Sequence, residues 1–231
     1  MGTHQKIIYG NFFFFQTYNY TLEEVKKYAK NAKFLNCTSS FYRPRENIYY
    51  NNYSINFWHN FAKEYIPLRK EIIHEVNIII KKLFGNSKNV LGVKIRGTDY
   101  TSRKKGHPIP PKVEQVISDV KILDEKYHYD FIFFSSEDEI IKKRFAPEFR
   151  DKLKLLNPNI YIKYDYKKNN VITLNENVKG NLDYLKNYVF NIIILSRCLD
   201  IVTARCSGAI GIFILTDGFR NSKIYNLGIY N

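Results

Sequence analysis

Five cationic side chains fall within twelve residues near the middle of the chain, enough charge to hold a diphosphate. They are Lys94, Arg96, Arg103, Lys104 and Lys105. An arginine guanidinium presents paired donors to phosphate oxygens and neutralises them without a metal ion. Asp99 is placed to orient Arg96, and Tyr100 stands beside both as a further candidate contact. The alternative interpretation is an exposed basic loop with one incidental ion pair.

The segment that must position these side chains has the pattern of a short buried strand followed by a loop. Residues 90–95 are largely apolar, whereas residues 96–107 show no hydrophobic period. Open α/β sheets bind ligands at the carboxyl ends of their strands. The sequence therefore predicts a ligand-binding loop after this strand. His107, at the end of the loop, is either a helix-entry residue or a base.

Helices and strands alternate after that loop, and this order predicts an α/β fold with a parallel sheet. Pro110 and Pro111 suit the first turn of a helix. Further along, Ser135-Ser136-Glu137-Asp138 is interpreted as an N-cap with acids in the first turn of a helix. The elements expected here are strands at 129–134, 160–164 and 200–203, a helix at 181–197 and a last element from Ser207-Gly208.

The N-terminal third is less regular. A Thr-Leu-Glu-Glu capping box at 21–24 predicts a helix through about Lys33. Apolar residues at helical spacing predict two further helices, at 57–65 and 72–83, and Gly85 ends the second. We therefore expect a partial N-terminal domain and a C-terminal domain, residues 1–85 and 86–231, with the boundary at 85–89.

The composition excludes several classes of protein. With 231 residues, 45% of them hydrophobic and 16% aromatic, the chain can bury a core, so intrinsic disorder is excluded. No apolar run approaches the roughly 20 residues of a membrane span, and the first residues lack a secretory-signal pattern. Three cysteines without metal-ligand spacing argue against a disulfide scaffold and a Cys-rich zinc site. We expect a cytoplasmic protein, or one peripheral to the inner face of a membrane.

The formal net charge of +14 points to nucleic acid, an anionic membrane surface or a phosphate-bearing small substrate. The lysines are spread through many segments among abundant Asn, Ile and Tyr, which favours an ordinary solvated surface. Nucleic acid is therefore not an expected partner. Peripheral contact with a membrane stays open as a role for the basic surface.

Several short motifs resemble, in the same order, the donor-binding domain of the fucosyltransferase superfamily, closest to its α-1,6- and protein O-fucosyltransferase branches. The motifs are Val-Leu-Gly-Val-Lys-Ile-Arg-Gly-Thr-Asp-Tyr (90–100), His107-Pro108-Ile109, Phe-Ser-Ser-Glu-Asp (134–138), Leu195-Ser196, Leu199-Asp200-Ile201-Val202 and Cys206-Ser207-Gly208. Family members carry an arginine-containing strand-loop, a His-Pro before the next helix, a second strand ending in small and acidic residues, and a Ser-rich turn. The resemblance covers about residues 85–231.

The resemblance implies a GT-B-like glycosyltransferase with a Rossmann-type parallel sheet in its donor-binding domain and a shortened N-terminal α/β acceptor domain. It implies transfer with inversion from a nucleotide-sugar donor, GDP-fucose, to a glycan or glycolipid, with no metal or other cofactor. Arg96 matches the family arginine that contacts the diphosphate and stabilises the leaving group. Ser207 and Gly208 match the turn that holds phosphate at a helix start. Ser136 and Glu137 fall where the family has two acids near the donor.

Three positions depart from the family pattern. Lys94 stands in place of a histidine, Gly97 in place of a second arginine, and Asn191 near the acidic residue that pairs with guanine. We retain as donor contacts, beside the matched positions, Lys94, Asp99, Tyr100, His107 and Asn191. No carboxylate lies between Tyr100 and His107 to act as a base. The missing base keeps one alternative open, a family member that binds nucleotide or glycan without turnover. The basic charge alone keeps a second open, a nucleic-acid-binding protein.

Overall fold

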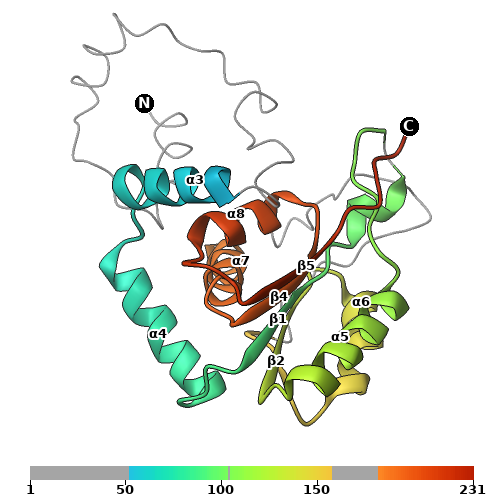
Figure 1. Cartoon of the computed structure of the whole chain (residues 1–231), viewed down its shortest axis with the longest axis horizontal. Coiled ribbons are helices and arrows are strands. Elements are labelled where there is room, and N and C mark those ends of the chain that lie inside the picture. Colours follow the sequence, from blue (N-terminus) through green and yellow to red (C-terminus); the bar gives the residue numbers. More distant parts are fainter. Residues whose placement is uncertain (1–51, 104, 158–181) are drawn as a thin grey trace, which may run out of the picture. The chain divides into compact units, whose positions relative to one another are not determined.

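The structure, a computed structural model, describes residues 52–103, 105–157 and 182–231 (Figure 1). The helix expected at 21–33, the strand expected at 160–164 and Lys104 lie outside these residues. The chain divides into two compact units, residues 1–73 and 74–231. The domain boundary expected at 85–89 stays a prediction.

Helix α3 (Asn52–Tyr65) and the start of α4 (Lys70–Phe84) belong to the first unit. These helices confirm the helical pair that apolar spacing predicts. On α3, the aromatic rings of Phe57, Trp58 and Phe61 contact one another. Within the described part of the chain, no helix is long and apolar enough to cross a bilayer.

The second unit is built on a five-stranded sheet in which every strand is parallel to its neighbours. The strand order is β3-β2-β1-β4-β5. The strands are β1 (Val90–Lys94), β2 (Phe131–Ser135), β3 (Leu153–Lys154), β4 (Asp200–Ala204) and β5 (Asn221–Tyr225). This arrangement confirms the α/β fold class with a parallel sheet.

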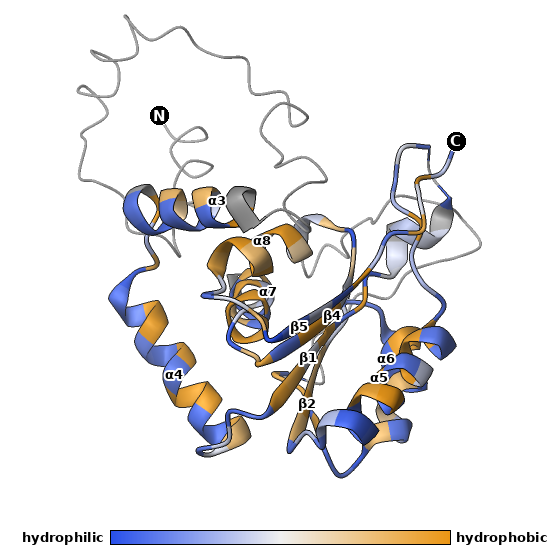
Figure 2. Cartoon of the chain, in the orientation of Figure 1, coloured by the Kyte–Doolittle hydropathy of each residue, from blue (hydrophilic) through white to orange (hydrophobic). Residues whose placement is uncertain are grey.

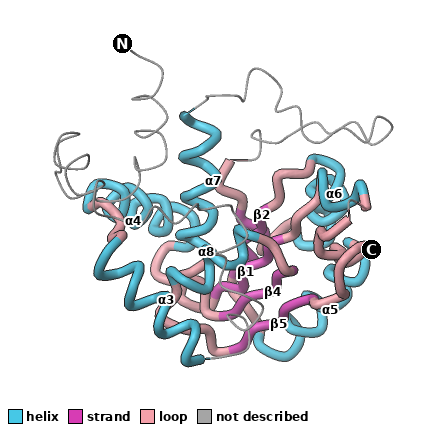
Figure 3. The backbone as a smooth tube through the Cα atoms, turned by 90° about the horizontal axis from the view of Figure 1, so that it is seen from above, coloured by secondary structure: helices cyan, strands magenta, loops and turns pink. Residues whose placement is uncertain are grey.

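Helices cover both faces of the sheet (Figures 1 and 3). Helices α5 (Val113–Tyr127) and α6 (Glu139–Phe145) lie on one face, and α7 (Leu182–Leu195) and α8 (Ser207–Leu215) on the other. Side chains alternate between the faces along a strand, so Leu91 and Val93 join the core beneath α5. Lys94 consequently belongs to the α7–α8 face. Figure 2 shows that α8 is hydrophobic nearly all round, as suits a helix packed in the interior.

Gly92 explains how α7 comes so close to β1. A Cβ at this position would lie 2.9 Å from the side chain of Ile201, 3.1 Å from Leu195 and 3.2 Å from Cys198. Because these neighbours are packed core groups, only glycine lets the helix and strand approach to this distance.

Two helix starts differ in detail from the sequence prediction. The cap of α5 is Lys112 in an extended conformation, so Pro110 and Pro111 precede the helix instead of forming its first turn. Helix α6 starts at Glu139 and is capped by Asp138. Glu137 therefore lies before the cap, outside the first turn in which the sequence pattern placed it.

A buried carboxylate, Asp200, lies at the end of the sheet where the parallel strands begin. Asp200, 1% exposed, accepts hydrogen bonds from Arg220 at 2.6 Å and from the Asn221 backbone N–H at 2.7 Å, and the Tyr129 hydroxyl also donates to it. Burial raises the pKa of Asp200, but these hydrogen bonds outweigh that effect and hold its pKa below the ordinary value. We call these four residues the Asp200 cluster.

Candidate functional site

The strand order creates one place where neighbouring loops leave the sheet in opposite directions. From β1 the chain proceeds to β2 and β3 on one side, and then crosses to β4 and β5 on the other. Parallel α/β sheets bind ligands at such a switch point, outside the carboxyl ends of the two central strands. Here these strands are β1 and β4, which lead into Arg96 and into Ser207.

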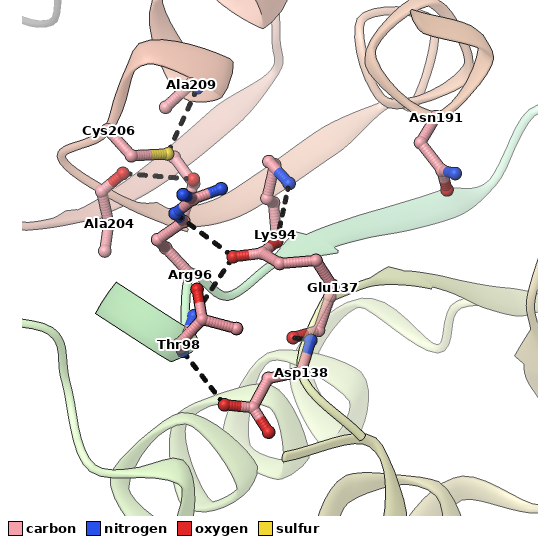
Figure 4. Close-up of polar contacts among 12 residues, drawn as sticks. Lys94, Arg96, Thr98, Glu137, Asp138, Asn191, Ala204, Cys206 and Ala209 are labelled. Atoms are coloured by element: carbon pink, nitrogen blue, oxygen red, sulfur yellow. Dashed lines mark hydrogen bonds and ion pairs between the residues drawn. The ribbon is translucent and has the colours of Figure 1, made fainter. Parts of the chain in front are cut away.

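The register of the sheet brings Arg96 next to an acid from the neighbouring strand. Lys94 pairs with Ser135 across β1 and β2, so Arg96 and Glu137 each lie two residues beyond a matched pair. The Arg96 Nε lies 3.1 Å from the Glu137 Oε1. In Figure 4 the Arg96 head group lies between Glu137 and Cys206. The loops that follow β1, β2 and β4 therefore meet at this point.

Glu137 is the centre of this group of side chains. It is 7% exposed, and its Oε1 also accepts from the Gly97 backbone N–H at 3.3 Å. Its Oε2 lies 3.8 Å from the Nζ of Lys94, which is 2% exposed. That distance is too long for a hydrogen bond, and among the described residues Oε2 has no hydrogen-bond partner. Two cations thus share one buried carboxylate, which leaves one positive charge in excess among the three.

Asp138 fastens the loop after β1 to the start of α6. Its Oδ2 accepts from the Thr98 backbone N–H at 3.0 Å, while its Oδ1 accepts from Ile140 N at 2.9 Å and Ile141 N at 3.3 Å. Thr98 has a φ of +52°, which a β-branched residue adopts only under constraint. The Asp138 contact supplies part of that constraint, so the backbone beside Arg96 is held in one conformation.

Aromatic rings from two segments surround the cations. The ring of Tyr100 is centred 5.2 Å from the Arg96 guanidinium carbon, and the ring of Tyr188 on α7 is centred 5.5 Å from the Lys94 Nζ. Both distances suit cation–π contacts. Tyr184 lies one turn before Tyr188, and burial, followed by the charge of Glu137, raises the pKa of Tyr184 to about 12. Sequence reasoning missed both α7 tyrosines, whose spacing of four residues was the available signal.

The start of α8 lies beside Lys94 and Tyr188. Cys206 is its N-cap, with the Sγ accepting from Ala209 N at 3.4 Å. Ser207 is exposed and Gly208 is buried, in the first turn of the helix. A Cβ on Gly208 would lie 2.7 Å from the Lys94 Cε and 2.8 Å from the Tyr188 hydroxyl. The positive end of the helix dipole therefore lies close to Lys94, and the first turn is suited to an anion.

Other predicted residues take local roles or lie further away. The Ser136 Oγ accepts from the Asp138 backbone N–H at 3.1 Å and so shapes the turn before α6. Asn191 lies on α7, 8% exposed, and its side-chain amide donates to the Asn187 carbonyl at 2.8 Å. Figure 4 shows it apart from the Lys94–Glu137 group. The donor contact of Asn191 stays a prediction, as does that of Asp99, whose side chain lies outside the described part.

His107 ends the loop and is attached to the last residues of the chain. Its ring lies 5.2 Å from the Tyr100 ring, and its Nδ1 is buried without a hydrogen-bond partner among the described residues. Its carbonyl accepts from Tyr230 N at 3.0 Å, and Gly106 N donates to the Tyr230 carbonyl at 2.9 Å. Arg103 and Lys105 are exposed on the same loop. The segment 228–230 therefore fixes the far end of the loop that starts at Arg96.

The described residues contain no group of three or more His, Cys, Asp or Glu side chains that could hold a metal ion. The chemistry that the arrangement supports is anion binding: a guanidinium and a buried ammonium, oriented by one carboxylate, beside a helix N-terminus. A diphosphate is an anion of the size and charge that such a site accommodates.

No protein-family model matches the chain, and no curated protein sequence matches it. Solved structures similar to it are fucosyltransferases. The fucosyltransferase NodZ from Bradyrhizobium is 13% identical, with 67% of this chain and 44% of that chain covered and a TM-score of 0.40. POFUT1 in complex with GDP-fucose is 11% identical, with 75% and 50% covered and a TM-score of 0.45.

The present chain spans about half the length of these two proteins, because the match covers 44% of the NodZ chain and 50% of the POFUT1 chain. Both TM-scores are below 0.5, so the family resemblance stated from the sequence motifs stays a prediction. The likeness concerns the fold alone.

Proposed function

We propose that the chain contains the donor-binding part of a glycosyltransferase that takes a sugar from a nucleoside diphosphate. The observation that carries the proposal is the position of Arg96. It follows β1 at the switch point of the sheet, its Nε is held 3.1 Å from a buried carboxylate, and the first turn of α8 is nearby. The order of the sequence motifs supports the same conclusion.

In this proposal the diphosphate lies between the Arg96 guanidinium and the backbone amides of Ser207 and Gly208. Negative charge develops on the departing phosphate oxygen as the sugar leaves, and a preoriented guanidinium stabilises it there. The transfer is inverting, as the family resemblance implies. It is independent of metal, because cations of the protein neutralise the diphosphate. The base that activates the acceptor comes from elsewhere in the protein or from the acceptor.

The donor in the proposal is GDP-fucose, and the acceptor is a glycan or glycolipid. GDP-fucose is the ligand named for the POFUT1 structure, and the sequence motifs point to the same donor class. Residues 86–231 form the donor-binding domain, and residues 1–85 belong to the acceptor side.

A thermal-shift panel of GDP, UDP, ADP and a short single-stranded oligonucleotide tests the binding part of the proposal. A ligand at 100 times its Kd stabilises the native state by about 2.7 kcal/mol, which corresponds to a rise in Tm of about 5–10 °C for a chain of this size. We expect GDP to give the largest rise, unchanged in EDTA. Stabilisation by the oligonucleotide alone would contradict the proposal, and a GDP effect that disappears in EDTA and returns with Mn²⁺ would contradict metal independence.

A second function, nucleotide binding without turnover, is favoured by one observation. The loop between Tyr100 and His107 carries no carboxylate that could serve as a base. Release of GDP from GDP-fucose, whether by hydrolysis or by transfer of the sugar, is the measurement that decides between the two functions. GDP binding with no turnover against any glycan acceptor would favour the binding module.

A further inference from the structure

Both oxygens of Glu137 are directed at the protein's own groups. Oε1 lies 3.1 Å from the Arg96 Nε and accepts a hydrogen bond from the Gly97 backbone N–H at 3.3 Å. Oε2 lies 3.8 Å from the Lys94 Nζ. The side chain is 5% exposed. We infer that Glu137 is a positioning residue that sets the plane of the Arg96 guanidinium, and not a ligand of the donor. This inference rests on the proposed function of Arg96.

The Arg96 side chain has several rotatable bonds, and an unanchored guanidinium would lose much rotamer freedom when it bound a diphosphate. Contact through Nε restricts the last of these bonds and so fixes the plane of the head group. The same carboxylate holds the Gly97 amide, so side chain and backbone are oriented together. Glu137 also offsets the charge of Lys94, whose side chain is 2% exposed and whose ammonium would be costly to bury without a nearby anion.

Glu137 also lowers the affinity of the site for the proposed diphosphate. It is a negative charge within contact distance of the group that binds an anion, so it weakens anion binding through Coulomb repulsion. A positioning role therefore predicts opposite changes in Glu137→Gln. Affinity for GDP should stay equal or increase a few-fold, whereas kcat should fall about 10–100-fold, as when an outer-shell partner of a functional group is lost. A donor ligand would instead lose affinity.

The first measurement needs no activity. The Nε–Hε NMR resonance of Arg96, assigned by its disappearance in Arg96→Lys, reports the contact with Glu137 directly. We expect this resonance to shift and to exchange faster with water in Glu137→Gln. Titration calorimetry with GDP and steady-state transfer from GDP-fucose then separate affinity, KM and kcat. Glu148→Gln is the matched control, since it removes the same charge from an exposed pair with Lys121 and should change none of these quantities.

Removing one partner of a buried ion pair can unfold a protein, so a second variant is required. Lys94→Met combined with Glu137→Gln removes one charge of each sign. The site keeps the excess of one positive charge that it has in the native chain, so the double variant should fold even if Glu137→Gln alone does not. The kcat should stay low, because Arg96 still lacks its anchor. The same Nε–Hε shift is expected in this double variant.

An Arg96 resonance that is unchanged in the folded variants, with GDP affinity reduced at least tenfold, would overturn the inference and make Glu137 a donor ligand. If the native chain binds no nucleoside diphosphate, the proposed function fails, and the Arg96 resonance alone decides whether Glu137 orients the guanidinium. The two failures are therefore distinguishable.

Discussion

Replacing Gly97 by alanine should break the fastening between the loop after β1 and the start of α6. An added Cβ would lie 2.5 Å from the Asp138 Cβ and 2.7 Å from its Cγ. The Asp138 Cβ is next to its backbone and cannot swing aside. The carboxylate must therefore leave its position, and the hydrogen bonds that it accepts from Thr98 and from the first turn of α6 are lost with it.

The expected loss can be worked from those contacts. Removing an Asp N-cap costs about 1 kcal/mol, and a buried backbone N–H left without its carboxylate costs about 1–3 kcal/mol. We expect Gly97→Ala to lower the free energy of unfolding by about 2–4 kcal/mol, which corresponds to a decrease in Tm of about 5–15 °C. Gly211→Ala in α8 is the control, because its Cβ would meet only the Ile192 methyl at 3.3 Å.

A double-mutant cycle with Asp138→Gly isolates the mechanism, and urea unfolding gives the four free energies. Asp138→Gly removes both the obstructing Cβ and the hydrogen bonds. In that background Gly97→Ala should cost less than about 1 kcal/mol, so the coupling should approach the upper part of the usual ~0.5–3 kcal/mol range. Additive effects of the two substitutions would refute the reasoning, because the cost of alanine would then come from the loop backbone and not from Asp138.

Three further predictions concern other parts of the second unit. The Asp200 cluster lowers the pKa of Asp200, so the ionised carboxylate contributes its full stability above the unfolded pKa of about 3.9 and loses it as the pH falls through the lower folded pKa. The free energy of unfolding should therefore fall with pH below pH 4, and Asp200→Asn should reduce this slope by up to about 1.4 kcal/mol per pH unit, as measured by urea unfolding. Asn191→Asp should increase the preference for GDP over UDP and ADP, because a carboxylate accepts two N–H donors of guanine; equal discrimination in both proteins would leave Asn191 an ordinary helix residue. Deleting residues 228–231 removes the partners of Gly106 and Ile109, so amide exchange at these two positions should become faster, whereas unchanged exchange would mean that the tail does not fix the loop.

Much of the framework around the site could be predicted because single segments carry it. The strand before Arg96, the polar loop after it and the helix start at Ser207-Gly208 are visible in consecutive residues. The fold class follows from their order. Strand β3, by contrast, has only two residues, and β5 has the mostly polar sequence Asn-Ser-Lys-Ile-Tyr, so neither gives a hydrophobic pattern.

The contact between Arg96 and Glu137 could not be predicted because it depends on the register of β1 against β2. The two residues are 41 positions apart in sequence, and a shift of one residue would direct their side chains elsewhere. The roles of Tyr184 and Tyr188 depend in the same way on the face that α7 turns toward Lys94. The sequence pattern identifies this helix, and only the packing shows which of its faces lines the site.

The central claim is that Arg96 stabilises the departing diphosphate, and turnover of GDP-fucose by Arg96→Ala tests it most directly. Losing a preoriented group of this kind costs ~10²–10³ in rate. We predict that loss for Arg96→Ala, assayed well below its Tm because the buried Glu137 loses a cation and stability falls. Arg96→Lys should be poorly active because one ammonium cannot make a two-pronged contact, and Lys105→Ala, on the exposed part of the loop, should have a smaller effect. Turnover by Arg96→Ala close to that of the native chain would contradict the claim.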